Sequence, residues 1–427
     1  MMSPLIGGLQ KTTNYKVVLP FYIYAALGFL SGTILLLCHT ETIGAHYFNP
    51  QALAITHTMA LAWGTMIIFG ASHQLLPVLV EGELDSDRLA YLTFIFTAIG
   101  TPLLVYGFYM FDMGLTLQIG AILINIGVIC YLANVLGSSF KSNRRNVHAW
   151  YVITSTLWLF ATTFFGLLLV LNFRNPILPS NSVDYLSFHA HLGIVGWFVL
   201  MVIGVGSRLI PIFMISKYTN DRILWLIFAL LNIALISFSI YYLADFSTFT
   251  FYIPIVLGLS AILLFGNHCY QAYKVRIRKR VDQQMKTSLI SVAQMLLPLV
   301  MLIIALAILP QEQFPGVVMI YGFCIFFGWL TAIILGMTFK TMPFIVWNKI
   351  YRNKAHQGKT PTPKEIFNDR IYQIMLYSYL VGFILFILGM IIRNQVILKI
   401  GALALLIAAI LYVYNVIITA AHKARQL

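Results

Sequence analysis

Charged residues are scarce in this chain of 427 residues: only 9% are Asp, Glu, Lys or Arg, whereas 60% are hydrophobic. In soluble domains about a quarter of all residues are charged, so this composition excludes a protein whose whole surface faces water. Cysteine is also scarce, with Cys38, Cys130, Cys269 and Cys324 and no Cys-x-x-Cys pair. That spacing argues against a disulfide framework and a zinc ribbon. The lipid bilayer is therefore the expected solvent of this chain.

Long hydrophobic runs take the place of the missing charge. A helix needs about 20 apolar residues to span a bilayer, and helix is the structure that satisfies the backbone of such runs in lipid. The sequence therefore predicts an all-α integral membrane protein in which residues 1–427 form a single domain. The predicted transmembrane helices are 18–38, 52–80, 89–111, 116–137, 149–172, 185–215, 223–243, 250–272, 287–309, 316–346, 371–392 and 397–420, twelve in all.

Lysine and arginine are distributed unevenly between these runs. Of the 27, only Arg174, Arg393 and Lys399 fall in outward loops if both termini lie inside. The other side carries the dense cluster at 274–280 and the basic loop 349–364. By the positive-inside rule, both termini are expected in the cytoplasm, with the chain in a membrane of the bacterial inner-membrane type. This placement explains the net charge of +14 without a nucleic-acid partner.

An internal repeat is the strongest pattern in the sequence. The second, sixth and tenth runs each carry Trp, Gly and Pro at offsets of +6, +13 and +20 from a reference residue, and the reference residues are 134 and 132 positions apart. The three sets are His57, Trp63, Gly70 and Pro77; His191, Trp197, Gly204 and Pro211; and Phe323, Trp329, Gly336 and Pro343. A polar residue stands three positions before each proline: Gln74, Arg208 and Lys340.

The repeat predicts three four-helix units, at approximately 18–137, 149–272 and 287–420, related by a pseudo-threefold axis. The second, sixth and tenth helices would lie inside. Their glycines would let neighbouring helices approach closely, and their prolines would end or kink each helix at the cytoplasmic surface.

Three of the ten histidines, His57, His189 and His191, lie within apolar runs. Ionisable side chains are costly in a membrane, so these three are expected to face the bundle interior and to have a partner or a function. Neutral imidazole is a common metal ligand. The other histidines, His73 among them, are interpreted as loop or interfacial residues. A zinc enzyme is not favoured, because no further ligands converge with these histidines in the sequence pattern.

The spacing of His189 and His191 directs them to different sides of the sixth helix. Each residue turns an α-helix by about 100°, so residues two apart point in nearly opposite directions. The repeat makes His191 the equivalent of His57, at matching depth on a neighbouring inner helix. The sequence therefore predicts a haem iron held axially between His57 and His191, with His189 directed into the other cleft, toward the tenth helix.

These features resemble subunit I of the haem-copper oxidase superfamily, which includes cytochrome c oxidases, quinol oxidases and nitric oxide reductases. The similarity rests on twelve helices in three units, the histidine of the second helix, and the stretch from His189-Ala-His191 through Gly196-Trp197 to Pro211. It implies that His57 and His191 bind a low-spin haem and that His189 binds a second, high-spin haem. One or two b-type haems are the cofactors that the resemblance implies.

The chain departs from the family in two respects. Its His-x-His pair lies on the sixth helix rather than the tenth, as if the sequence were rotated by one unit. The histidines of the family's copper or non-haem iron centre are also missing, and no His-His dipeptide occurs. At the corresponding places stand Tyr321 and Cys324 in the tenth helix and Tyr372, Tyr377 and Tyr379 in the eleventh. Copper is therefore not expected.

The leading interpretation is a haem-binding membrane protein for electron transfer, or for binding or reduction of a small gas such as O2 or NO. It would be an oxidoreductase if it turns over, with a periplasmic cytochrome or membrane quinol as electron donor. The alternative is a non-enzymatic protein that handles haem or copper, assists oxidase assembly or confers nitric oxide tolerance. A secondary transporter is less favoured, since transporter sites lie at broken helices near the bilayer midplane.

Overall fold

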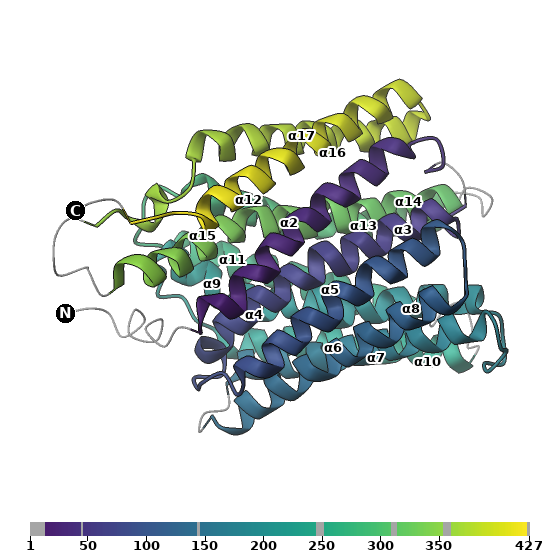
Figure 1. The fold of residues 1–427 in the computed structure, drawn as a ribbon, viewed down its shortest axis with the longest axis horizontal. Helices are drawn as coiled ribbons and strands as arrows, with labels where there is room; N and C mark the ends of the chain where they lie inside the picture. Colours follow the sequence, from purple (N-terminus) through teal and green to yellow (C-terminus); the bar gives the residue numbers. More distant parts are fainter. Residues whose placement is uncertain are drawn as a thin grey trace.

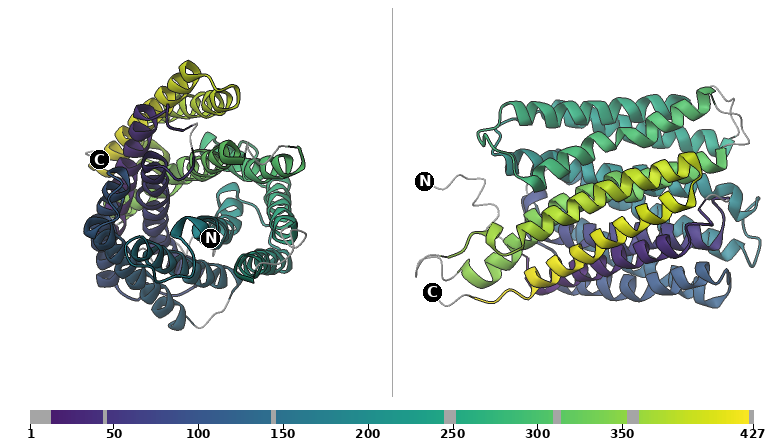
Figure 2. Two further views of the ribbon diagram at one scale, coloured as in Figure 1. Left: turned by 90° about the vertical axis from the view of Figure 1, so that its right-hand side faces the viewer. Right: turned by 90° about the horizontal axis from the view of Figure 1, so that it is seen from above.

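The computed structural model describes residues 13–43, 46–142, 146–244, 252–308, 314–352 and 360–424. Within these ranges, twelve helices are long and apolar enough to cross a membrane, which confirms the expected all-α membrane fold (Figure 1). The helices lie side by side as one bundle, seen nearly end-on in the left view of Figure 2. The first residue of the first long helix and the last residue of the twelfth lie at the same end of the bundle (Figure 1).

Each span is either one continuous helix or a series of helical segments joined end to end. The first four spans are α2 (Tyr15–Cys38); α3 (Pro50–His57), η1 (Thr58–Thr65) and α4 (Met66–Leu79); α5 (Asp87–Tyr109); and α6 (Leu115–Phe140). The next four are α7 (Val147–Asn172); η2 (Ser182–Tyr185), α8 (Leu186–His191), η3 (Leu192–Val199) and α9 (Leu200–Met214); α10 (Asp221–Ala244); and α11 (Tyr252–Lys274). The last four are α12 (Gln283–Gln294) and α13 (Leu296–Ile308); α14 (Phe314–Phe323), η6 (Cys324–Leu330) and α15 (Thr331–Tyr351); α16 (Asp369–Ile392), preceded by η8 (Pro363–Glu365); and α17 (Gln395–Ala420).

Polar N-caps explain why seven helices begin two to four residues before the predicted spans. In each case a side-chain oxygen accepts a hydrogen bond from a backbone N–H of the first turn, which would otherwise have no partner. The capping residues are Asn14, Asn49, Ser86, Asn146, Asp282, Asn368 and Asn394. Hydropathy alone does not include these polar starts.

The second, sixth and tenth spans are the most buried helices, as the repeat predicts. In their most apolar windows 72%, 72% and 67% of residues are buried, against 28–50% in the other nine described spans. A helix that is buried on most sides lies inside the bundle, whereas a helix buried on half its surface or less faces lipid on the rest. The three helices that carry the repeated pattern therefore form the interior.

The repeat also recurs in the backbone. A π-helical segment begins directly after each reference residue: η1 after His57, η3 after His191 and η6 after Phe323. π-helical turns are rare and occur mostly as single turns within α-helices, often at functional sites. Three of them at equivalent positions support three related helices. The pseudo-threefold axis itself stays a prediction.

Each repeated glycine packs against the first helix of its own unit. A Cβ at Gly70 would lie 2.8 Å from Cβ of Phe21 in α2, and one at Gly336 would lie 2.7 Å from the carbonyl oxygen of Gln284 in α12. Gly204 makes the equivalent contact with Tyr151 in α7. Any larger residue would push these helices apart, so the close approach expected from the glycines is confirmed.

Tryptophan–threonine hydrogen bonds join the inner helices to one another. The indole Nε1 of Trp63 donates to Oγ1 of Thr331 at 3.0 Å, and that of Trp197 donates to Oγ1 of Thr65 at 3.1 Å. Both threonines stand eight residues after a reference residue. The sixth span thus bonds to the second, and the second bonds to the tenth. In the sixth span, the residue eight positions after His191 is Val199, which has no hydroxyl.

The prolines act differently from one unit to the next. α4 and α9 end within three residues of Pro77 and Pro211, as expected, whereas α15 continues through Pro343 to Tyr351. Of the two predicted effects, ending or kinking the helix, the third proline does not show the first. The predicted span 287–309 is divided at Met295 into α12 and α13, because Pro298 lacks the N–H that would bond to the carbonyl of Gln294.

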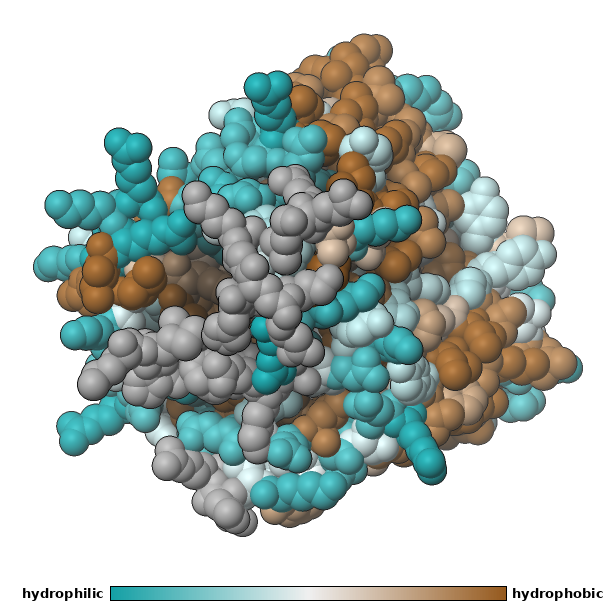
Figure 3. Space-filling view, turned by 60° about the vertical axis from the view of Figure 1, so that its left-hand side comes forward, coloured by the Kyte–Doolittle hydropathy of each residue, from teal (hydrophilic) through white to brown (hydrophobic). Residues whose placement is uncertain are grey.

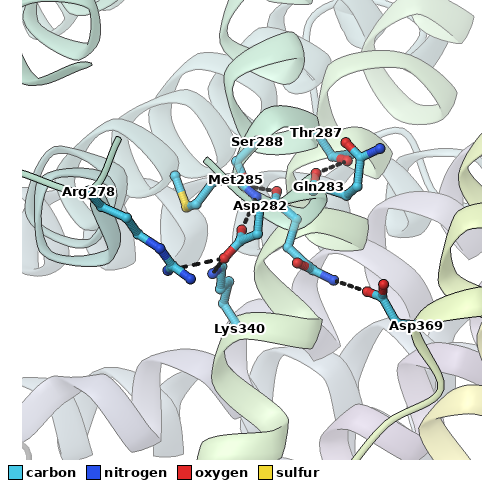
Figure 4. A network of polar contacts seen from close by, with 9 residues as sticks. Arg278, Asp282, Gln283, Met285, Thr287, Ser288, Lys340 and Asp369 are labelled. Atoms are coloured by element: carbon cyan, nitrogen blue, oxygen red, sulfur yellow. Dashed lines mark hydrogen bonds and ion pairs between the residues drawn. The ribbon is translucent and has the colours of Figure 1, made fainter. Parts of the chain in front are cut away.

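The end of the bundle that holds the start of α2 and the end of α17 is covered with hydrophilic side chains, whereas its flank is hydrophobic (Figure 3). At this end of the bundle, the charge of Lys340, the polar residue of the third repeat, is paired with a carboxylate. Nζ of Lys340 forms an ion pair and hydrogen bond with Asp282, which also pairs with Arg278 at 3.2 Å, and Gln284 next to it donates to Asp369 at 3.3 Å (Figure 4). This network joins α12, α15 and α16.

Candidate functional site

A cavity of about 630 Å³ lies at the opposite end from that ion-pair network, between the inner helices and the outer helices α5, α6 and α7. Its walls are mainly aliphatic and aromatic, with a few polar groups such as Asn125 and Thr162. All three histidines singled out in the sequence, His57, His189 and His191, line it. Pockets for small molecules and cofactors range from about 300 to 1,000 Å³ and combine apolar walls with a few polar groups.

His57 is the last residue of α3 and is held by two contacts. Its Nδ1 donates to the carbonyl oxygen of Leu53, one turn earlier, at 2.8 Å. Its ring stacks on Phe108 of α5, with 4.5 Å between ring centres and 27° between planes. A carbonyl can only accept, so Nδ1 carries the proton and Nε2 keeps its lone pair. The ring is thus fixed with Nε2 as its binding nitrogen.

His191 is held in the same way on α8. Its Nδ1 donates to the carbonyl oxygen of Ser187 at 2.8 Å, which again leaves Nε2 as the acceptor. The hydroxyl of Tyr321 in α14 lies 3.4 Å from that Nε2, at the long end of hydrogen-bond distance, and the ring of Phe238 in α10 packs at 4.8 Å. His191 therefore faces α10 and α14.

His189 faces the other side of α8. Its ring lies so close to α7 that a Cβ at Gly166 would stand 2.8 Å from its Cε1. It is near enough to His57 for the two imidazoles to interact electrostatically. Its Nδ1 is buried without a hydrogen-bond partner among the described residues. The small size of Gly166 makes the room that this ring occupies.

The two histidines do point in different directions, but His191 faces the tenth span, where His189 was expected. His191, rather than His189, contacts the tenth span, whereas His189 packs against Gly166 of α7. The helix period gives the angle between two residues on one helix. It does not give the rotation of that helix about its own axis, which depends on packing against α7 and α10.

The donor set fits a metal-bearing planar cofactor such as haem. Histidines that bind a metal almost always donate their second ring N–H to a carbonyl, carboxylate or water, which fixes the tautomer and the ring orientation. His57 and His191 both do this. In the described part of the chain, no three His, Cys, Asp or Glu side chains gather closely enough to hold one metal ion together. The three imidazoles thus border the cavity without forming such a cluster among the described residues.

Three further histidines are buried where the sequence suggested loop or interfacial positions. His73, His148 and His268 are exposed by 0%, 6% and 1%. Nδ1 of His73 donates to the carbonyl oxygen of Phe69 at 2.7 Å, and Nδ1 of His148 lies 3.0 Å from the carbonyl oxygen of Gly204. They lie near helix ends, where hydropathy cannot separate a residue that faces water from one that faces a neighbouring helix. The contact of His148 with a repeated glycine is the signal that could have revealed it.

No protein-family model matches this chain, and no curated protein sequence is significantly similar to it.

Proposed function

We propose that this multi-span membrane protein binds haem in the cavity bordered by His57, His189 and His191, for electron transfer or for binding or reduction of a small gas such as O2 or NO. The observation that supports the proposal is that three histidines chosen from the sequence border one cofactor-sized, mainly apolar cavity. When bound, haem would supply the redox and gas-binding chemistry.

The side chains of the cavity would orient and shield such a group. His57 offers Nε2 because its Nδ1 is held by Leu53. The electrostatic interaction between His57 and His189 agrees with His189 as the partner of His57, whereas the resemblance implies His191 in that role. Nε2 of His191 is directed at the hydroxyl of Tyr321, which would have to turn away before His191 could bind iron. The aromatic and aliphatic walls would keep water from the iron, a condition that tunes haem potential.

The remaining parts of the proposal follow from the topology. Both termini would face the cytoplasm of a bacterial-type inner membrane, since the basic loops lie on the side of the termini. The cavity would then lie near the outer face, within reach of a periplasmic cytochrome or a membrane quinol as donor. The resemblance to subunit I of the haem-copper oxidases agrees with this arrangement.

Haem content of the purified full-length protein tests the proposal. Protein from haem-replete cells is expected to give at least one haem per chain by pyridine haemochrome analysis, and His57→Ala to lose it. His73→Ala is the control, because it removes a buried imidazole that does not line the cavity. A colourless wild-type preparation would contradict the proposal. Steady O2 or NO consumption with an artificial donor separates an enzyme from a haem-binding protein without turnover.

A further inference from the structure

A basic surface with exposed aliphatic side chains lies at the ends of two candidate membrane spans, away from the histidine cavity. It is formed where the chain leaves α9 and α11, at residues 215–217 and 274–280. Lys217, Lys274, Lys279 and Arg280 are exposed there, as is Arg278, which pairs with Asp282.

The two segments are bonded into one unit. Ser216 and Arg276 form an isolated antiparallel bridge, and the N–H of Ile277 donates to the carbonyl oxygen of Ile215 at 3.1 Å. The guanidinium of Arg276 lies 3.7 Å from the ring centre of Tyr273 and donates to two backbone carbonyls. These bonds hold the turn after α11 in place.

Exposed aliphatic residues alternate with the cations of this unit. Ile215, Val275 and Ile277 are exposed by 54%, 50% and 59%. Ile215 also has a left-handed backbone, with φ 53° and ψ 50°, which is strained for a β-branched residue. Figure 3 shows hydrophobic side chains among the hydrophilic ones at this end of the molecule. A basic cluster that only sets membrane topology requires neither exposed aliphatic side chains nor a strained backbone at Ile215.

We propose that residues 215–217 and 274–280 form a binding site for anionic phospholipids of the adjacent leaflet. The site directly follows the last residues of two membrane-spanning helices, Met214 and Lys274, so it lies at the level of the lipid headgroups. The cations attract lipid phosphates, as basic clusters next to a transmembrane helix do. The three aliphatic side chains enter the boundary between headgroups and acyl chains.

Lipid binding to the purified full-length protein in neutral detergent tests the site. The probes are phosphatidylglycerol and, as a zwitterionic comparison, phosphatidylcholine, with bound lipid counted by native mass spectrometry. The triple variant Lys274→Gln, Lys279→Gln, Arg280→Gln is expected to bind phosphatidylglycerol about 100-fold more weakly, since each cation near an anionic surface contributes about five-fold. Phosphatidylcholine binding stays unchanged.

A matched variant removes equal charge elsewhere: Arg88→Gln, Lys364→Gln, Arg370→Gln, all exposed residues at other helix ends. The site would be refuted if the two triple variants lost phosphatidylglycerol to the same extent, or if neither lost any.

Ile215→Gly separates lipid binding from folding. Glycine relieves the left-handed strain, so the thermal midpoint in detergent should rise, while phosphatidylglycerol binding should fall by several-fold because the side chain is gone. Unchanged phosphatidylglycerol binding in this variant would remove the aliphatic residues from the site.

Discussion

Replacing Gly166 with alanine would press on His189 without touching any other histidine of the cavity. The added Cβ would lie 2.8 Å from Cε1 of His189. Carbon atoms in contact prefer about 3.5–4.0 Å, so the ring must retreat by roughly 0.7–1.2 Å. Binding sites must be held to about 0.5 Å of the productive geometry. If His189 binds haem, Gly166→Ala should therefore change the haem spectrum while the protein still folds.

The same contact sets the effect on stability. Overpacking lowers the free energy of unfolding by about 1–3 kcal/mol. Alanine in place of glycine within a helix raises it by about 1 kcal/mol. The net destabilisation is then about 0–2 kcal/mol. In a His189→Ala background the clash disappears, and Gly166→Ala should stabilise by about 1 kcal/mol. The coupling between the two positions is therefore about 1–3 kcal/mol.

Unfolding in mixed micelles and absorption spectra are measured for the wild type, Gly166→Ala, His189→Ala and the double variant. Together they give the coupling energy between the two positions and the change in the haem spectrum. Gly258→Ala is the control, since a Cβ at that position of α11 meets nothing within 4 Å. The expected clash with His189 is refuted if Gly166→Ala behaves like Gly258→Ala in stability and spectrum, or if its effect persists unchanged when His189 is absent.

Two further predictions concern polar contacts between helices. Trp197→Phe removes the indole N–H that donates to Thr65 and should destabilise the protein by about 1 kcal/mol, in the range of hydrogen bonds between membrane helices. In a double-mutant cycle with Thr65→Val, the coupling energy should account for most of that loss. Full additivity of the two substitutions would contradict the bond. Lys340→Met leaves Asp282 with one cationic partner and should destabilise by about 1–3 kcal/mol, less than the loss of a fully buried pair because both side chains keep 13% and 11% exposure. Adding Asp282→Asn should restore part of the stability in urea unfolding, and a further loss would contradict the pairing.

Most of the fold could be predicted from hydrophobic run lengths, because lipid leaves the backbone few alternatives to helix. The repeat adds the interior position of three helices, since Trp, Gly and Pro recur at one spacing in them alone. The break at Met295 was missed even though Pro298 is visible in the sequence. An apolar run that includes a proline still spans the membrane, so hydropathy does not reveal that it consists of two helices.

The candidate site could be predicted in its residues but not in its directions. Histidine within apolar sequence is rare enough to mark His57, His189 and His191. Which imidazole faces which neighbour depends on how the sixth span rotates against Gly166 on one side and Tyr321 on the other. Such packing involves residues more than 100 positions apart in the chain, as between His191 and Tyr321, and helix periodicity contains none of it.

The wide turns after residues 57, 191 and 323 allow a precise intervention. Each π-helical segment holds more residues per turn than an α-helix, so deleting one residue from it could restore regular winding. Because the wide turn already takes up the extra residue, the helix on either side of such a deletion would keep nearly its present orientation, whereas a deletion within regular α-helix would rotate one side by about 100° against the other. In the sixth span, a deletion within Leu192–Val199 would therefore keep the imidazoles and the glycine and proline half close to their present neighbours, whereas a deletion in the regular helix before Gly204 would turn the two halves of the span against each other.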